Sequence, residues 1–162
     1  MTPVGEAKNP YGLVQLLDAR DLSVEAELAR IRDTQLILTG RYTNWINDVA
    51  EFNGVLQSRL RNKENIEIEN KAAMLGANGN ELLTSISDLG ILLPLLGMMP
   101  TSSLITISSK ILLMKPDQKQ ADNTVFLEQD IRSLSLRVRT AQEWKNEALS
   151  ALEMRRFQLS KR

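Results

Sequence analysis

Two stretches near opposite ends of the chain carry apolar residues at alternating three- and four-residue spacing. This is the a/d pattern of a heptad repeat, which places a narrow apolar seam along one side of a helix and requires a partner helix to cover it. The residues that we expect to form this assembly seam are Leu28, Ile31, Leu38, Tyr42, Trp45, Val49, Phe52, Leu56, Leu127, Ile131, Leu134, Val138, Ala148 and Leu152. The pattern favours helix association over chemistry.

Polar side chains interrupt both ladders at nominal seam positions. Gln35 lies in the first, and Lys145 and Arg155 lie in the second. A polar residue at such a position often specifies the register or the number of helices. Alternatively, the end of a ladder is exposed and the long side chain reaches solvent. We interpret Arg155 as exposed and keep the register interpretation open for Gln35.

The seam, the prolines and the glycines divide the chain into four segments of one domain. We expect a flexible leader over residues 1–10, an N-terminal helical region over 11–76, a central insert over 77–116 and a C-terminal helix over 117–162. Asp21 or Ser23 is suited to cap the main N-terminal helix, which is predicted to end before a turn at residues 76–80. Gly40 and Gly54 lie inside this helix, where each marks either a bend or the close approach of a partner helix.

The central insert differs in composition from its flanks. Residues 81–93 resemble a short helix stopped by Pro94, whose ring does not continue a helix. The β-branched residues within 101–114 suggest a β-hairpin, with a third short helix as the alternative. The predicted fold is therefore mainly α: a long antiparallel coiled-coil hairpin of the N- and C-terminal helices with a small insert.

The composition excludes several classes of function. The 20 Lys and Arg residues balance the 20 Asp and Glu residues, so nucleic-acid binding is disfavoured. The chain has no Cys and no His, which removes thiolate nucleophiles, Ser–His–Asp triads and the commonest zinc ligands. The carboxylate pairs Glu143/Glu147, Glu67/Glu69 and Asp21/Glu25 are expected on solvated helix faces. We predict a protein that is not an enzyme and has no catalytic residue, cofactor or metal.

Neither the N-terminus nor the most apolar run predicts a membrane segment. The first ten residues are polar, include two prolines and lack the apolar core of a cleavable signal peptide. The apolar run over 89–99 spans about half of the roughly twenty residues that a bilayer-spanning helix needs. Contact between residues 89–114 and a membrane surface stays an open alternative.

The layout of terminal heptad helices, a central insert, no Cys and a polar leader resembles the filament and needle-tip proteins of bacterial type III secretion systems. The segment Asn9-Pro10-Tyr11-Gly12-Leu13 and the apolar residues after it are also similar to that family. The resemblance implies export in an unfolded state without a cleavable signal, a chaperone that covers the seam before export, and self-assembly outside the cell.

The sequence thus predicts a non-enzymatic structural protein that forms a homo-oligomer or filament, with itself and an export chaperone as partners. One alternative is an intracellular, cytoplasmic adaptor or scaffold, for example phage-encoded, that binds a partner helix along the seam. The other is a translocator that touches a membrane through residues 89–114.

Overall fold

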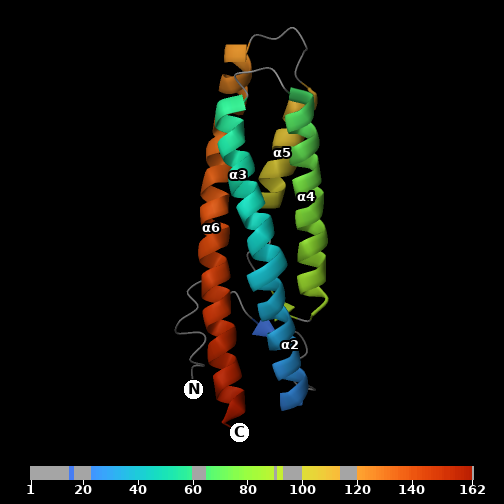
Figure 1. Ribbon diagram of the computed structural model, residues 1–162, viewed down its shortest axis with the longest axis vertical. Helices are drawn as coiled ribbons and strands as arrows, with labels where there is room; N and C mark the ends of the chain where they lie inside the picture. The colour runs from blue at the N-terminus through green and yellow to red at the C-terminus, as the bar shows by residue number, and fades with distance from the viewer. Residues whose placement is uncertain are drawn as a thin grey trace. The chain divides into compact units, whose positions relative to one another are not determined.

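The computed structural model describes residues 15–16, 23–59, 65–89, 91–92, 100–113 and 120–161 (Figure 1). The protein is mainly α-helical. Its elements in chain order are β1 (Gln15–Leu16), α2 (Val24–Ile37), η2 (Leu38–Tyr42), α3 (Thr43–Arg59), α4 (Asn65–Ser87), β2 (Ile91–Leu92), α5 (Pro100–Leu112) and α6 (Gln120–Ser160). β1 and β2 form a two-residue antiparallel ladder. The predicted leader and the stop at Pro94 lie outside the described residues.

Helix α2 begins after Ser23, one of the two predicted cap residues. The Ser23 hydroxyl oxygen accepts a hydrogen bond from the backbone N–H of Ala26 at 3.1 Å. This bond pairs one of the N–H groups that the first turn of a helix leaves free. After α2, the backbone widens into the π-helical segment η2, which contains Gly40. The Thr43 hydroxyl donates to the Leu38 carbonyl across this segment at 2.7 Å. A Cβ at Gly40 would meet none of the described residues within 4 Å, so no described helix approaches closely there.

The prediction of one N-terminal helix up to Leu75, with a turn at 76–80, is wrong. Helix α3 ends at Arg59, and α4 runs without interruption from Asn65 to Ser87. The boundary placed at residue 76 therefore lies inside a helix. Figure 1 shows α3 and α4 running in opposite directions.

Close packing explains why glycines occur inside α4. A Cβ at Gly79 would lie 2.5 Å from the Trp45 ring and 2.6 Å from the Thr101 hydroxyl. A Cβ at Gly76 would lie 3.2 Å from the Ile105 side chain. These glycines serve the close approach of neighbouring helices, which offsets their low helix propensity of about 1 kcal/mol relative to Ala.

The β-hairpin predicted within residues 101–114 is also wrong, and the alternative of a third short helix is correct. Pro100 opens α5 at a position where its missing N–H costs nothing. Leu104, Ile107 and Ile111 are buried at helical spacing. Burial of this stripe outweighs the strand preference of the β-branched side chains, which is weak and depends on context.

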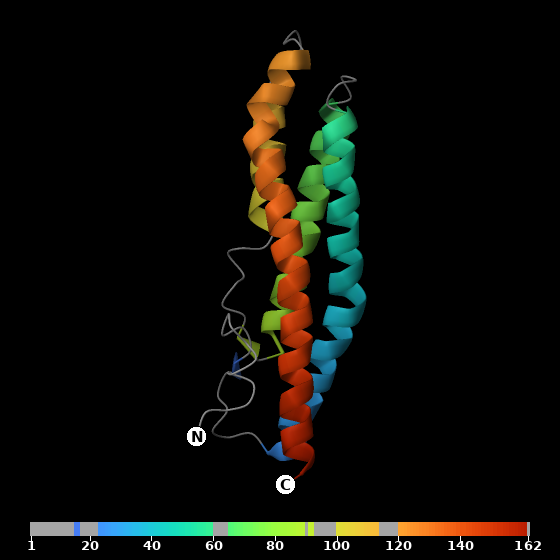
Figure 2. The ribbon, with the colours of Figure 1, turned by 90° about the vertical axis from the view of Figure 1, so that its left-hand side faces the viewer.

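The described residues cluster into two compact units. Unit 1 combines residues 1–43, 81–97 and 142–162, and unit 2 combines residues 44–80 and 98–141. Each unit therefore draws on segments that are far apart in the sequence. Four helical segments of unit 2, from α3, α4, α5 and α6, pack side by side (Figures 1 and 2).

Candidate functional site

The predicted assembly seam is buried in the folded chain. Of its residues only Leu28 is partly exposed. The buried members in unit 1 are Ile31, Leu38, Tyr42, Ala148 and Leu152. The buried members in unit 2 are Trp45, Val49, Phe52, Leu56, Leu127, Ile131, Leu134 and Val138. The ladders are thus correct as core positions, and they leave little apolar seam on the surface of one copy.

An aromatic pair lies at the centre of the unit 1 core. The ring centroids of Tyr42 and Trp144 are 5.4 Å apart, with the ring planes tilted by 55°. Such tilted pairs add about 1 kcal/mol beyond the area that they bury. Burial raises the pKa of the Tyr42 hydroxyl well above its usual range, because the charged form would lose its hydration. Tyr42 therefore stays neutral and serves packing.

Polar contacts set the register of α2 against the end of α6 in unit 1. The Arg155 guanidinium donates from Nε and Nη2 to the two carboxylate oxygens of Glu27, at 2.6 and 3.2 Å. The Gln35 amide donates to the Glu153 carboxylate at 3.0 Å. Because the earlier residue on α2 pairs with the later one on α6, the two segments run antiparallel.

The interpretation of Arg155 as an exposed ladder end is wrong. Arg155 is only partly exposed and pairs with Glu27, whose side chain is 8% exposed. A bidentate pair of this kind has a narrow geometry, which gives it directional specificity. For Gln35, the contact with Glu153 agrees with the register interpretation. Lys145 does not belong to the core, whereas its neighbour Trp144 does, with 1% of its surface exposed.

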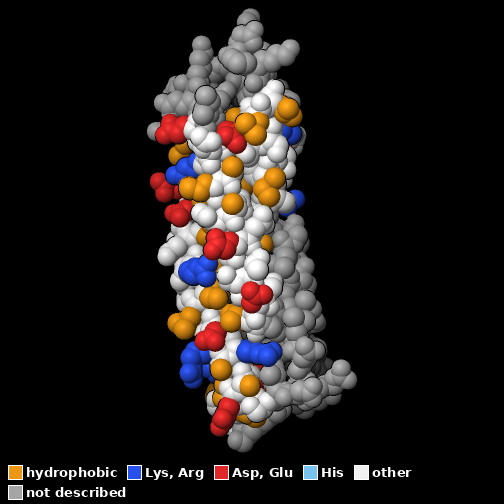
Figure 3. All heavy atoms as spheres, turned by 90° about the vertical axis from the view of Figure 1, so that its right-hand side faces the viewer, with side chains coloured by type: hydrophobic (Ala, Val, Ile, Leu, Met, Phe, Trp, Pro, Cys, Tyr) orange, Lys and Arg blue, Asp and Glu red, His pale blue; other side chains and the backbone are white. Residues whose placement is uncertain are grey.

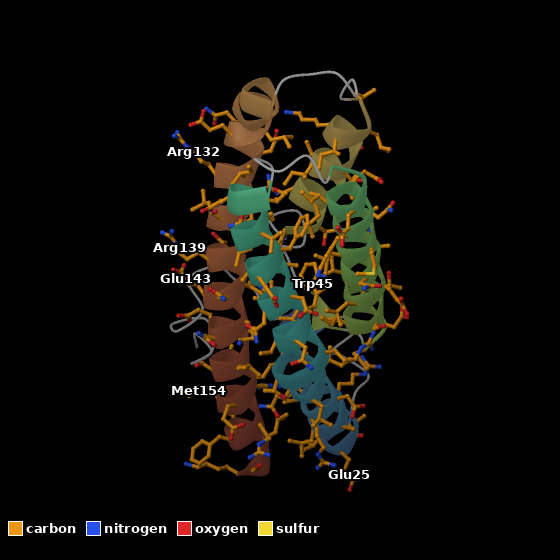
Figure 4. The ribbon with its side chains drawn as sticks, turned by 45° about the horizontal axis from the view of Figure 1, so that its top comes forward. Glu25, Trp45, Arg132, Arg139, Glu143 and Met154 are labelled. Atoms are coloured by element: carbon orange, nitrogen blue, oxygen red, sulfur yellow. The ribbon has the colours of Figure 1, made fainter. Side chains whose placement is uncertain are left out.

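Hydrogen bonds connect the four helices of unit 2 in a ring. The Trp45 indole on α3 donates to the Leu75 carbonyl on α4 at 2.9 Å. The Asn53 amide on α3 donates to the Ser135 hydroxyl on α6 at 2.6 Å. Figure 4 shows Trp45 among the side chains between the helices, whereas Arg132 and Arg139 project outward from α6.

Two further contacts close this ring through α5. The Ser108 hydroxyl donates to the Glu69 carboxylate on α4 at 3.0 Å, and Lys110 pairs with Asp130 on α6 at 2.7 Å. Helix α5 is therefore bonded on both sides, to α4 and to α6. These contacts define unit 2 as a four-helix bundle.

Several core residues were missed because the predicted seam was too narrow. Ile46 and Asn53 follow seam positions directly and are buried, as is Ile86 near the end of α4. A helix that packs against two neighbours needs a stripe wider than a/d alone. The adjacent pairs Trp45-Ile46 and Phe52-Asn53 indicate such a wider stripe. Asn53 is polar, however, so the sequence alone does not suggest that it is buried.

Two of the carboxylates considered for acid–base chemistry lie on exposed helix surfaces. Glu143 is exposed and points outward from α6 in Figure 4, and Glu67 is exposed on α4. An open hollow of about 260 Å³ in unit 2 is lined by Glu51, Glu67 and Lys71 with Phe52, Val55 and Ile68. Among the described residues, no group of three or more Asp or Glu side chains is placed to hold a metal ion. Asp21 lies outside the described residues.

No described helix combines the length and the apolar character that crossing a bilayer would require.

Comparison with protein-family models, with curated proteins and with solved structures gave no significant match. The geometry of the two units is therefore the basis for a functional proposal.

Proposed function

We propose that this chain is a non-enzymatic structural protein that self-assembles into a filament or a similar secretion-associated appendage. The observation that carries the proposal is the antiparallel pairing of the terminal helices in unit 1, through Glu27–Arg155 and Gln35–Glu153. Directional contacts hold one register, so every copy presents the same outer side chains. A regular polymer needs such identical, repeatable surfaces.

The burial of the seam changes where subunits would meet. Because the folded chain covers its own seam, contacts between copies would use the outer faces of the helices. Large hydrophobic side chains are exposed there, and they are Leu36, Met74, Ile105, Leu112, Leu113, Leu136 and Phe157. Single exposed hydrophobic residues are common, so their grouping on one face decides whether they mark an interface.

Export adds a chaperone to this proposal. In an unfolded chain the seam is exposed and would associate prematurely, which gives a physical reason for a chaperone that covers it. The adaptor alternative is less well supported, because a partner helix could reach the seam only by displacing one of the chain's own helices.

Sedimentation velocity on the full chain at two well-separated concentrations, with electron microscopy of the same samples, tests the proposal. Self-assembly predicts that the mean mass grows with concentration by mass action and that regular fibres form. A monomer at both concentrations, without fibres, would contradict it. A discrete complex that forms only with a second protein would favour the adaptor.

A further inference from the structure

We propose that the outer face formed by α4 and α5 in unit 2 is the surface on which a second copy of this chain docks, around a two-fold axis. This inference rests on the proposed self-assembly and names one of the surfaces that it uses, because a two-fold contact by itself closes a dimer and a filament needs a further contact. We call this surface the neutral face. Its members are Ala73, Ala77 and Asn80 on α4 and Ile105, Ser109 and Leu112 on α5.

Contacts between the two helices place these residues on one face. Gly76 lies against the Ile105 side chain, and Glu69 accepts a hydrogen bond from Ser108, so this side of α4 is turned toward α5. Ala73 and Ala77 follow Glu69 at four-residue intervals, on the outer edge of the same side. Ile105, Ser109 and Leu112 follow one another at intervals of four and three on α5. All six members are exposed.

The neutral face carries no charged side chain. The rest of the surface differs, since exposed positions of α6 in the same unit include Glu128, Arg132 and Arg139. The charge on α5, Lys110, is directed to Asp130 on α6. Glu69 borders the face, and its carboxylate is engaged by Ser108. Depletion of charge with retention of large apolar side chains distinguishes the cores of protein interfaces from the remaining surface.

The shape of the face also suits its own copy. Ile105 and Leu112 are 45% and 69% exposed and form a ridge, whereas the neighbouring row of Ala73 and Ala77 is low. Across a two-fold axis, the ridge of one copy would lie in the low row of the other, in the manner of ridges-into-grooves helix packing. A face without charge also meets its copy without like-charge repulsion.

A second copy fits these observations better than a lipid surface does. Binding to anionic lipid relies on Lys and Arg around an apolar patch, and the neutral face has neither among its members. Figure 3 shows the side of the molecule that includes α4, where hydrophobic side chains lie among uncharged, acidic and basic ones.

A matched pair of serine substitutions tests the face in the full chain. Ser109 lies at the centre of the α5 row, and Ser133 is an exposed serine on α6 in the same unit. Ser109→Arg places a charge that would be desolvated against the low row of Ala73 and Ala77 of the other copy, so we expect association to weaken about tenfold or more in sedimentation. Ser133→Arg makes the same chemical change away from the face and should leave association at the wild-type level.

Cysteine cross-linking gives an independent readout, because the natural chain has no cysteine. Because the α5 ridge of one copy would lie against the α4 row of the other, Ser109→Cys on one copy should form a disulfide with Ala73→Cys on the other under mild oxidation, and Ser133→Cys should form much less with it. Circular dichroism verifies that all five variants are folded.

The outcomes separate this inference from the proposed function. If the wild type associates but neither Ser109 variant differs from its Ser133 counterpart, the neutral face is wrong and self-assembly stands. If the wild type stays monomeric at every concentration, both fail. Binding of a monomeric wild type to anionic vesicles, strengthened by Ser109→Arg but not by Ser133→Arg, would also overturn the second copy as occupant.

Discussion

The carboxylate of Glu27 receives both hydrogen bonds of a bidentate contact from Arg155, 128 positions later in the chain. Glu27 lies in the first turn of α2, where a negative charge also favours the helix dipole. The pair therefore joins the start of α2 to the last turns of α6 within unit 1. It is the polar contact whose loss should most affect the pairing of the chain's ends.

Replacement Arg155→Met should lower the free energy of unfolding by about 2 kcal/mol, because it leaves a buried carboxylate without its partner. Arg156→Met is the matched control. Arg156 pairs with Glu153, and both side chains are at least half exposed, so we expect a loss below about 0.5 kcal/mol. Urea unfolding measures both. The double variant Glu27→Leu/Arg155→Met should recover most of the loss, and a failure to recover would show that packing rather than charge dominates.

Replacement Gly79→Ala should destabilise unit 2 by about 1–3 kcal/mol, because the new Cβ would clash with Trp45 and Thr101. Gly54→Ala makes the same change in α3, where nothing lies within 4 Å of the new Cβ. There we expect a gain of about 0.5–1 kcal/mol from helix propensity. Thermal unfolding, followed by circular dichroism, shows whether each substitution lowers or raises the stability. Equal effects at the two positions would argue against the close packing at Gly79.

Replacement Trp45→Phe should cost about 1 kcal/mol more than Trp144→Phe. Both changes remove a similar volume from a core, but the Trp45 indole donates to the Leu75 carbonyl, whereas the buried Trp144 indole N–H has no hydrogen-bond partner among the described residues. The difference is therefore the net value of one buried hydrogen bond. Denaturant unfolding of the two variants measures it. A larger loss for Trp144→Phe would contradict this assignment.

Stability should fall with pH above about 10 in a manner that depends on Tyr42. Burial raises the pKa of Tyr42 in the folded state, so the unfolded chain loses its proton first, at about pH 10. The contribution is fully present below the pKa of the unfolded state and is lost as the pH rises, with a slope of up to about 1.4 kcal/mol per pH unit. The test is to measure the unfolding free energies of wild type and Tyr42→Phe between about pH 8 and 11, a range that brackets the pKa of a tyrosine in the unfolded chain. The stability of the wild type should fall relative to that of Tyr42→Phe as the pH rises above about 10, and a constant difference would refute it.

Much of the core could be predicted because burial follows helical periodicity. Leu38, Val49 and Leu56 in the first ladder and Leu127 and Leu134 in the second are fully buried, as their spacing indicated. The helix over 120–160 and the cap at Ser23 could also be predicted from residues close in the sequence. These features depend on the residue itself and on neighbours within one or two turns, which is the range over which sequence patterns act.

Elements whose conformation depends on distant contacts were misread. Gly76 and Gly79 resemble a helix stop, yet they permit Ile105 and Trp45 to approach α4. Ile105 and Ile107 resemble a strand, yet α5 forms because α4 and α6 offer partners on both sides. In each case a contact between remote segments outweighs a local preference of about 1 kcal/mol.

By itself, then, the sequence determined a mainly α-helical chain, the residues of its two apolar ladders and the absence of thiol and imidazole chemistry. The tertiary structure decided which helices cover those ladders, and it assigned Arg155 to Glu27 rather than to solvent. The physical reason is that a heptad pattern specifies an apolar side that must be covered but not the partner that covers it. That choice depends on shape and charge between segments far apart in the chain.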